Sequence, residues 1–146
     1  MRIISHRGNL NKIDSENENR PMFIEQAIEE GFEVETDVWY VDGFYLGHDK
    51  PQYAVSLDWL KSLPLWCHCK NKEALTRLLD EGVHCFWHEN DHHTLTSRGI
   101  PWSYPDNWVK NGITVVFCDQ PIDVPDYILG VCVDNPILWK NRSETK

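Results

Sequence analysis

The first third of the chain concentrates side chains that could act on a phosphodiester. Histidines, an arginine and several carboxylates occur there in four short motifs: His6-Arg7-Gly8, Glu18-Asn19, Glu35-Thr36-Asp37 and His48-Asp49. A phosphodiester resists attack because its negative charge repels nucleophiles and because its leaving alkoxide needs a proton. A cation, a phosphate clamp and an acid/base pair lower both barriers. The residue types of this segment therefore suit phosphodiester cleavage.

Each of these side chains has a part that it could perform. Glu35 and Asp37 alternate onto one face of an expected strand and could hold a hard divalent cation. Arg7 can grip phosphate oxygens in bidentate fashion, and His6 and His48 can transfer protons near neutral pH. Two unpaired carboxylates on a strand buried on both faces would be costly, and a shared cation relieves that cost. We therefore predict that Glu35 and Asp37 are metal ligands.

The order and spacing of the motifs resemble the glycerophosphodiester phosphodiesterase family of the phospholipase-C-like superfamily. The resemblance is clear over residues 3–50, where Asp42-Gly43 also matches a turn of the family. It is weaker at Cys69-Lys70, where the family usually carries Glu-x-Lys, and it returns faintly at residues 130–136. Residues 83–128 depart from the family pattern. What the resemblance implies is therefore strongest for the first third of the chain.

The resemblance implies a metal-dependent phosphodiesterase and assigns parts to the matching residues. His6 and His48 would be the general base and the general acid, although the sequence does not decide which is which. Arg7 would bind the phosphate, and Glu18 would lie at the rim of the site as a further candidate. We expect Asn19 to be structural and to cap the first helix.

One expected metal ligand differs from the family pattern. The family's third metal carboxylate falls at His68, two residues before the matching lysine, Lys70. The resemblance implies Mg²⁺ or Ca²⁺, but histidine is a softer ligand, so Mn²⁺ or Zn²⁺ would bind relatively better than with three carboxylates. Lys70 could neutralise phosphate charge. We predict Glu35, Asp37 and His68 as the metal site.

The second half of the chain supplies weaker candidates. Trp102 belongs to an aromatic segment that resembles the wall of the family's pocket, and we expect it to contact substrate. His88 follows an expected strand and could face the site. Asp134 resembles the Asp of the family's closing motif, and we expect a structural role. His84, His92 and His93 with nearby acidic residues match no zinc spacing, so we favour a polar loop over a second metal site.

The expected fold is α/β, in the form of a reduced or incomplete TIM-type (β/α) barrel. The family's complete barrel usually takes about 250 residues, whereas this chain has 146, which suits one phosphodiesterase-like domain over residues 1–146. The pattern predicts full-length helices only after the first and third of the strands below, one helical turn at 125–129 and a frayed tail from Lys140. The expected strands are 2–6, 33–39, 65–70, 83–87, 113–118 and 130–133, with a short one at 44–47.

Composition limits the partners. The formal net charge of −9 disfavours nucleic acids and anionic membrane surfaces, so we expect a small-molecule phosphodiester as substrate. No run of about 18 apolar residues occurs, which predicts no membrane insertion, and the absence of a signal-peptide pattern predicts a cytoplasmic protein. Five cysteines at scattered spacings suit reduced thiols. A trimmed barrel would leave strand edges uncovered, so a homodimer is a reasonable expectation.

Two other functions remain open from the sequence. A catalytically degenerate protein that binds phosphoryl ligands would explain histidine in place of a metal carboxylate and the missing part of the barrel. A lyase that releases a cyclic phosphate would use the same residues and differ only in its product. The loops that would select the alcohol groups of the substrate lie in residues 88–128, where the resemblance fails.

Overall fold

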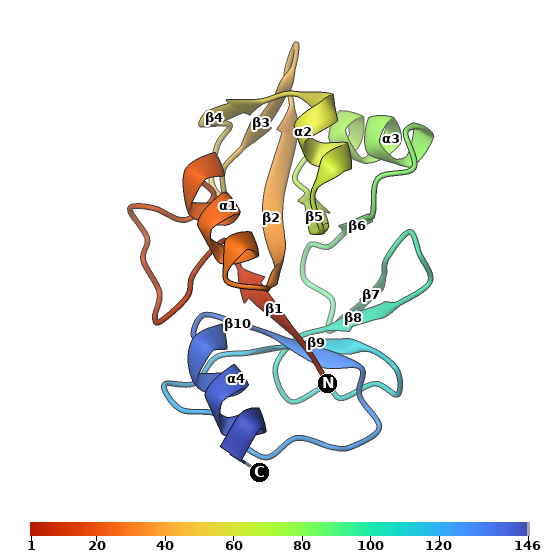
Figure 1. Cartoon of the computed structure of the whole chain (residues 1–146). Coiled ribbons are helices and arrows are strands. Elements are labelled where there is room, and N and C mark those ends of the chain that lie inside the picture. The colour runs from red at the N-terminus through yellow and green to blue at the C-terminus, as the bar shows by residue number, and fades with distance from the viewer. Residues whose placement is uncertain (146) are drawn as a thin grey trace.

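The computed structural model describes residues 1–145, which form a mixed α/β fold with ten strands in one mostly parallel sheet and four helices (Figure 1). The strands are β1 (Arg2–His6), β2 (Glu33–Tyr40), β3 (Phe44–Leu46), β4 (Tyr53–Val55), β5 (Leu65–Cys69), β6 (Cys85–Trp87), β7 (His93–Leu95), β8 (Pro101–Ser103), β9 (Ile113–Val116) and β10 (Gly130–Val133). The helices are α1 (Pro21–Glu29), α2 (Leu57–Ser62), α3 (Lys72–Asp80) and α4 (Pro136–Thr145).

The parallel strands follow the order β6-β5-β2-β1-β10-β9-β8. The first strand of the chain thus lies beside the last, and Ser5 pairs with Val34 on one side and Val133 on the other. The β3–β4 hairpin extends β2 in antiparallel fashion, and β7 pairs with β8 in the same way. The two outermost parallel strands, β6 and β8, are not paired with each other. The loop between β7 and β8 contacts β6, where the amide of Ser97 donates to the carbonyl of Cys85 at 2.8 Å. Because the seven strands of this order run parallel, their carboxyl ends all lie on the same side of the sheet.

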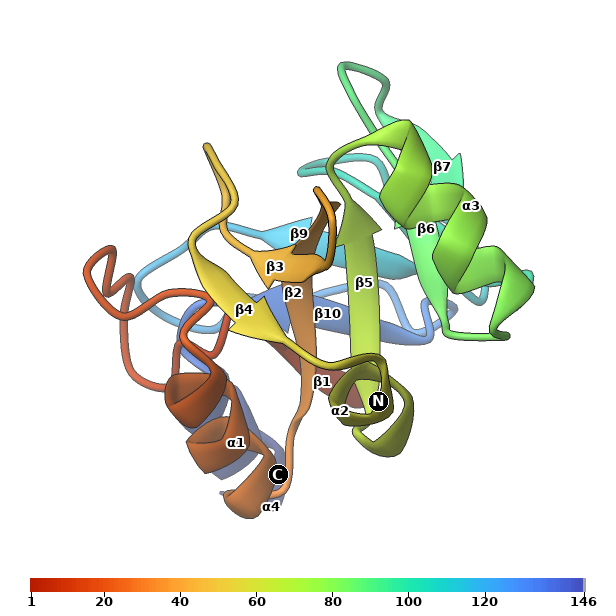
Figure 2. The ribbon, with the colours of Figure 1, turned by 90° about the horizontal axis from the view of Figure 1, so that it is seen from above.

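Two apolar layers hold the sheet in place. On one face, aromatic and aliphatic side chains from six strands form a buried cluster whose members are Ile4, Trp66, Phe86, Trp102, Ile113, Val115 and Cys132. On the other face of β2 and β5, Val34, Val38 and Cys67 pack with buried residues of α1 and α3. Figure 2 shows α1, α2 and α3 at the periphery of the molecule, outside β2 and β5. Alternation along each strand thus separates the two layers.

The sequence predictions for the strands agree with the structure, with β6 and β9 somewhat shorter than expected. Side chains cap two of the helices: Ser56 Oγ accepts from Trp59 N at the start of α2, and Asn71 Oδ1 accepts from Ala74 N at the start of α3, each at 3.0 Å. Two tryptophans of the second half pack against the sheet. Trp102 is fully buried in the sheet cluster, and Trp108 is half-buried against the cluster that contains Val116.

Other predictions about the elements were wrong. Asn19 does not cap α1, since the N-cap is Arg20 and no side chain caps that end. The tail from Lys140 is not frayed up to Thr145 but belongs to α4, which packs Trp139 against β10 residues such as Val131. Residues 125–129 contain no helix, and only residues 126–127 form a turn. Within residues 1–145, the four helices include none with the length and apolar character needed to cross a membrane.

Candidate active site

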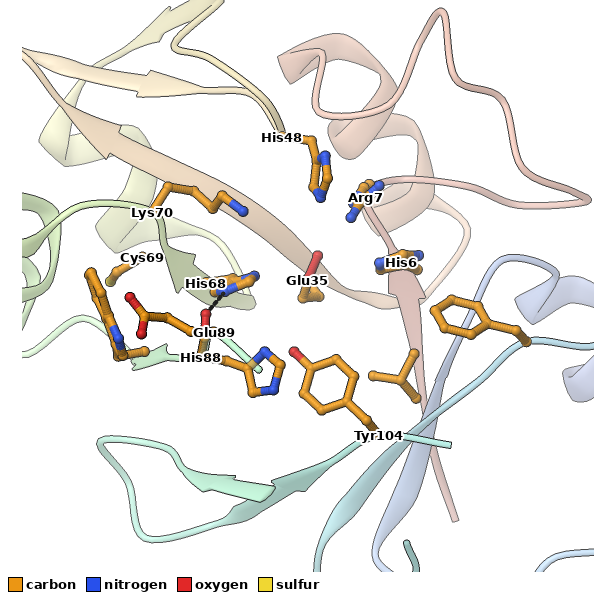
Figure 3. Close-up of a pocket in the computed structure, with 13 residues that line it drawn as sticks. His6, Arg7, Glu35, His48, His68, Cys69, Lys70, His88, Glu89 and Tyr104 are labelled. Carbon is orange, nitrogen blue, oxygen red and sulfur yellow. Dashed lines mark hydrogen bonds between the residues drawn. The ribbon is translucent and has the colours of Figure 1, made fainter. Parts of the chain in front are cut away.

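A pocket of about 360 Å³ opens at the carboxyl ends of the parallel strands. Its lining residues lie on or just beyond seven different strands, and they are His6, Arg7, Glu35, His48, His68, Cys69, Lys70, Trp87, His88, Glu89, Tyr104, Val115 and Phe117. Figure 3 shows Glu35 in the middle, between His6 and His68, with the Lys70 ammonium pointing inward. Most of the residues predicted from the sequence therefore meet in one pocket, although they come from separate parts of the chain.

The backbone after β1 explains the His6-Arg7-Gly8 motif. Arg7 has a φ of 58° and Gly8 a φ of 91°, both in the left-handed region. A Cβ on Gly8 would lie 2.7 Å from Phe23 Cδ2, so a larger residue would collide with α1. This tight turn leaves His6 at the strand end and directs the Arg7 guanidinium toward Asp37, whose Oδ2 is 3.1 Å from Arg7 Nε.

Glu35, Asp37 and His68 form a buried group of potential metal ligands. One ligand atom from each residue lies within 4.8 Å of the other two. Glu35 and Asp37 share a face of β2, and the pairing of β2 with β5 sets Asp37 beside His68, with Oδ1 and Nδ1 3.1 Å apart. The predicted convergence of these three side chains is confirmed. Metal binding itself stays a prediction.

Asp37 is held by several groups at once. Asn19 Nδ2 donates to its Oδ2 at 3.0 Å, while the Asn19 Oδ1 accepts from Thr36 Oγ1 and from the Asp37 amide. Burial alone would raise the pKa of Asp37, but His68, Arg7 and Asn19 together hold that pKa well below its usual range. Asn19, predicted as a helix cap, instead fixes the orientation of a site carboxylate.

The surroundings of Glu35 raise its pKa, whereas those of Asp37 lower the pKa of that carboxyl. Burial raises the pKa of Glu35, and the neighbouring Asp37 carboxylate raises it further. Its Oε1 accepts no hydrogen bond from any described residue, although the side chain is almost completely buried. A buried carboxylate oxygen without a donor is rare in folded proteins. The two oxygen ligands and one nitrogen ligand therefore suit a divalent cation bound by Glu35, Asp37 and His68.

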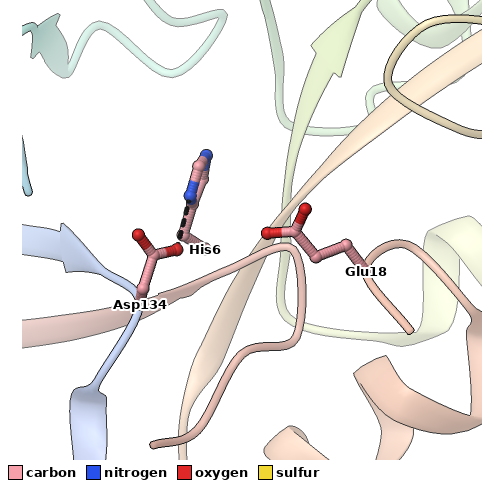
Figure 4. A group of neighbouring side chains, drawn as sticks. All are labelled: His6, Glu18 and Asp134. Carbon is pink, nitrogen blue, oxygen red and sulfur yellow. Dashed lines mark hydrogen bonds and ion pairs between the residues drawn. The ribbon is translucent and has the colours of Figure 1, made fainter. Parts of the chain in front are cut away.

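His6 belongs to a second buried cluster at the ends of β1 and β10 (Figure 4). Its Nδ1 lies 2.8 Å from Asp134 Oδ1, and Asn9 Nδ2 donates both to this oxygen at 2.9 Å and to Glu18 Oε2 at 2.7 Å. Burial alone would lower the pKa of His6, but the bond to Asp134 and the nearby Glu35 raise it above the usual value. The cluster thus fixes the ring of His6 through its Nδ1.

Glu18 and Arg7 complete this side of the pocket. Arg7 Nη1 lies 3.5 Å from Glu18 Oε1, so Glu18 contacts both the guanidinium and the Asn9 amide. His6, Glu18 and Asp134 are close enough to hold a cation, but the hydrogen bonds through Asn9 already connect the two carboxylates. We therefore interpret Asp134, Asn9 and Glu18 as residues that position His6.

His48 lies at the exposed rim of the same pocket. Its Nδ1 is 2.8 Å from Asp49 Oδ1. Gly47 precedes it with a φ of 155°, and a Cβ there would lie 2.0 Å from the Lys50 carbonyl oxygen. The glycine thus permits a close turn that carries His48 over the pocket. His88 lies on the opposite wall, where its ring stacks on Tyr104 with centroids 3.8 Å apart.

Trp102 is a correction to the predicted site. It is fully buried in the sheet cluster and does not line the pocket, whereas Tyr104 does. The two residues lie on the same face of the chain because side chains alternate along β8. Tyr104, just beyond the carboxyl end of β8, is the one that reaches the pocket. The prediction therefore identified the correct face of the strand, but Tyr104 and not Trp102 lines the pocket.

The histidine-rich segment forms no second metal site within residues 1–145. His84 instead bonds Thr96 Oγ1 at 2.8 Å and packs on the Trp66 ring. His92 lies 3.4 Å from the Asn107 amide nitrogen, and His93 begins β7. No group of three potential ligands includes His84, His92 or His93. That this segment is a polar loop and not a metal site stays a prediction.

Several residues in the pocket or in contact with His6 were not predicted to take part in the site. Asp134 was expected to be structural, although it contacts His6 directly. Trp87, Tyr104 and Phe117 were not identified as pocket residues either. Each of these four residues lies at or just beyond the carboxyl end of a parallel strand, which is the one signal that could have identified them.

Comparison of the chain with protein-family models, with curated proteins and with solved structures found no match in any of the three.

Proposed function

We propose that this protein is a metal-dependent phosphodiesterase that hydrolyses a small glycerol- or sugar-phosphate diester. The observation that carries the proposal is the unpartnered Glu35 Oε1, buried beside Asp37 and His68 in a pocket that also contains Arg7 and His6. A cation bound by Glu35, Asp37 and His68 would neutralise phosphate charge and stabilise the transition state of attack at phosphorus.

We further propose that the fold is a reduced TIM-type barrel. The strand order supports this interpretation because β1, β2, β5 and β6 pair in chain order, β8, β9 and β10 do so as well, and β10 pairs with β1, whereas β6 and β8 are not paired with each other. The position of the pocket at the carboxyl ends of the strands also supports it, since barrel enzymes carry their active sites there. In the second half, loops and the β7 strand take the place of the missing helices.

Two basic side chains would bind the phosphate. Arg7 lies at the pocket with its guanidinium between Asp37 and Glu18, which fixes its orientation. Lys70 follows β5 and points into the pocket from the opposite side (Figure 3). A guanidinium and an ammonium on two sides of the pocket suit an anionic group bound between them.

His6 and His48 would transfer the protons of the reaction. His6 is buried and held by Asp134, whereas His48 is exposed at the rim beside Asp49. A proton must leave the attacking oxygen and another must reach the leaving alkoxide, and two histidines on one pocket can serve both steps. By analogy with the family that the sequence resembles, a neighbouring hydroxyl of the substrate would attack phosphorus first, and water would then open the cyclic phosphate.

A second candidate function is supported by the contacts of Asp37. Its two carboxylate oxygens lie 3.1 Å from Arg7 and from His68, so the cationic side chains alone balance much of its charge. A protein that has lost its metal could use the same arrangement to bind a phosphoryl ligand without turnover.

A phosphodiesterase assay separates the two functions. A nitrophenyl phosphodiester is incubated with the full chain and Mg²⁺, Ca²⁺, Mn²⁺ or Zn²⁺, with a chelator as control and Glu35→Gln as the matched variant. Metal-dependent turnover that the variant lacks supports the enzyme. Saturable binding of the diester without release of nitrophenol under any metal would instead support the binding protein.

A further inference from the structure

Tyr104 forms the wall of the pocket at the end of β8, one residue beyond Ser103. Its backbone is fixed by three hydrogen bonds. The Tyr104 amide donates to the His92 carbonyl at 3.0 Å, and the Tyr104 carbonyl accepts from the Asn107 backbone amide at 3.1 Å and from Asn107 Nδ2 at 3.2 Å. The ring stacks on the His88 ring, with centroids 3.8 Å apart and planes inclined by 23°. Both the main chain and the ring of Tyr104 are therefore held in place.

The hydroxyl of Tyr104 points into the middle of the pocket, toward Glu35 (Figure 3). The Trp102 indole N–H lies near the same oxygen, but an indole can only donate a hydrogen bond. None of the described residues accepts a hydrogen bond from the Tyr104 O–H. Burial raises the pKa of Tyr104, and the Glu35 carboxylate raises it further, so the phenol keeps its proton near neutral pH. The pocket thus contains a neutral donor that lacks an acceptor.

The position of this donor complements the two basic side chains. Figure 3 shows Tyr104 on the opposite side of Glu35 from Arg7 and Lys70. A phosphodiester has two non-bridging oxygens that point in different directions, so it can accept hydrogen bonds from two walls at once. A cationic side chain in place of Tyr104 would be attracted to the Glu35 carboxylate, whereas a neutral hydroxyl stays available to a ligand. A hydroxyl on this wall therefore suits the second oxygen of a phosphate.

We propose that Tyr104 donates a hydrogen bond from its hydroxyl to a non-bridging oxygen of the substrate phosphate. This inference rests on the proposed phosphodiesterase function and adds a third donor to Arg7 and Lys70. Negative charge on the non-bridging oxygens must be stabilised while the attacking oxygen bonds to phosphorus, and a donor that is already fixed in position does this without reorganising. Tyr104 is then a catalytic residue that contacts substrate and transfers no proton itself.

Tyr104→Phe is the informative variant, because it removes only the hydroxyl and keeps the ring that stacks on His88. Tyr127→Phe is the matched control, since Tyr127 is 46% exposed and lies outside the pocket. We expect Tyr104→Phe to lower kcat for a nitrophenyl phosphodiester about 10- to 100-fold, as for one lost hydrogen bond to a charged group, and Tyr127→Phe to leave kcat unchanged. A kcat like that of the wild type in Tyr104→Phe would overturn the inference while the phosphodiesterase function stands.

Phosphorothioate diesters test which atom Tyr104 contacts. Replacing one non-bridging oxygen with sulfur gives two isomers that differ only in the position of the sulfur, and sulfur is a weak acceptor. The measured quantity is the ratio of wild-type to Tyr104→Phe rates for each isomer, so that an effect of sulfur on a bound cation cancels. We expect a much smaller ratio for the isomer whose sulfur faces Tyr104. Equal ratios for the two isomers would overturn the inference.

Thermal unfolding with metal separates this role from an effect on the metal ligands. If Tyr104 acted by orienting Glu35 or by binding the cation, Tyr104→Phe would respond less to Mn²⁺ than the wild type does. We expect the change in Tm with Mn²⁺ to be the same in both proteins. A smaller change in Tyr104→Phe would overturn the proposed contact with phosphate.

A binding measurement keeps the inference separable from the proposed function. If the wild type hydrolyses no diester with any metal, the phosphodiesterase function fails, but dimethyl phosphate can still be titrated into the full chain and followed by NMR. We expect its Kd to be about 3- to 10-fold higher for Tyr104→Phe than for the wild type, as for one lost hydrogen bond. Equal Kd values for the two proteins, or no binding by either, would overturn the inference.

Discussion

His6 and Asp134 join the end of the first strand to the end of the last one, with His6 Nδ1 and Asp134 Oδ1 2.8 Å apart. The contact is buried, and Asn9 Nδ2 donates to the same Asp134 oxygen at 2.9 Å. Because β1 and β10 are hydrogen-bonded neighbours, the two side chains leave adjacent strand ends and meet at the pocket. A histidine held in this way keeps a fixed ring orientation and presents Nε2 to the pocket.

Replacing Asp134 with Asn should lower the pKa of His6. The carboxylate stabilises the imidazolium by hydrogen bond and by charge, and a neutral amide supplies neither to the same degree. An NMR titration of the His6 ring protons measures the shift. Asp119→Asn serves as the control, since Asp119 is exposed and does not contact His6. An unchanged His6 pKa in Asp134→Asn would show that the pair is not the main cause of the raised value.

The same pair should make stability depend on pH in a defined window. The pKa of His6 is raised on folding, so its contribution to stability is complete below about 6.5, its unfolded value, and is lost as pH rises through the folded value. The pKa of Asp134 is lowered, so its contribution is present above about 3.9 and is lost as pH falls through the folded value.

We therefore expect Asp134→Asn to cost more stability near about pH 5.5 than near about pH 8.5, because a larger fraction of His6 is charged at the lower pH. Urea unfolding of wild type and variant at both pH values measures the difference. A loss of stability that is the same at both values would contradict the proposed charge interaction.

Replacing His6 or His48 with Ala should remove most phosphodiesterase activity. General acid and base groups typically contribute about 10²- to 10⁴-fold to the rate, and neither histidine belongs to the predicted metal ligands. The measurement is kcat with a nitrophenyl phosphodiester and saturating metal, together with KM as a check that substrate still binds. His93→Ala is a suitable control because this exposed histidine lies outside the pocket. Rates like the wild type in either variant would refute the proposed pairing.

The metal site should respond to changes at Glu35 and His68. Mn²⁺ should raise the Tm of the wild type but not of Glu35→Gln, since a ligand at about 100 times its Kd stabilises the folded state by about 2.7 kcal/mol. His68→Glu replaces a nitrogen ligand with a carboxylate, so the variant should be less stable without metal and should prefer Mg²⁺ more strongly than the wild type does.

Thermal unfolding across a metal series, with calorimetric titration of each ion, measures both effects. Asp58→Asn, on the exposed face of α2, controls for a general loss of negative charge. An equal rise in Tm for wild type and Glu35→Gln would show that the cation binds outside the proposed site.

The predictions from sequence were most accurate where chemistry and local pattern coincide. Glu35 and Asp37 share a face because strand side chains alternate, and the α/β class of the fold followed from the alternating strand and helix pattern. Asp134 was different. Its partner His6 is 128 positions away, so only the pairing of β1 with β10 reveals the contact.

Two other residues show why local pattern was not enough. Asn19 precedes a helix and has the composition of a cap, but its side chain binds Thr36 and Asp37 across a tertiary contact that the cap rule does not consider. Helix α4 buries only Pro136 and Trp139, so it lacks the regular apolar stripe from which a helix is predicted. In both cases, tertiary packing decided the outcome.

Trp102 should stabilise the folded state and should not contact substrate. Its ring is fully buried and stacks on Phe86 at 4.7 Å between centroids, with Trp66 at 5.6 Å, in the cluster beneath the pocket. Trp102→Ala should therefore lower the free energy of unfolding by about 3–5 kcal/mol, as for other buried aromatic residues. Trp108→Ala is the matched comparison, because Trp108 is only half-buried and should cost less.

Urea unfolding followed by circular dichroism measures the effect of both tryptophan variants. A conservative third variant, Trp102→Phe, should retain most of the stability because it keeps an aromatic ring between Phe86 and Trp66. If Trp102→Ala lost less than 1 kcal/mol while its activity collapsed, Trp102 would act on substrate after all, and the aromatic cluster would not be the support of the pocket that we infer.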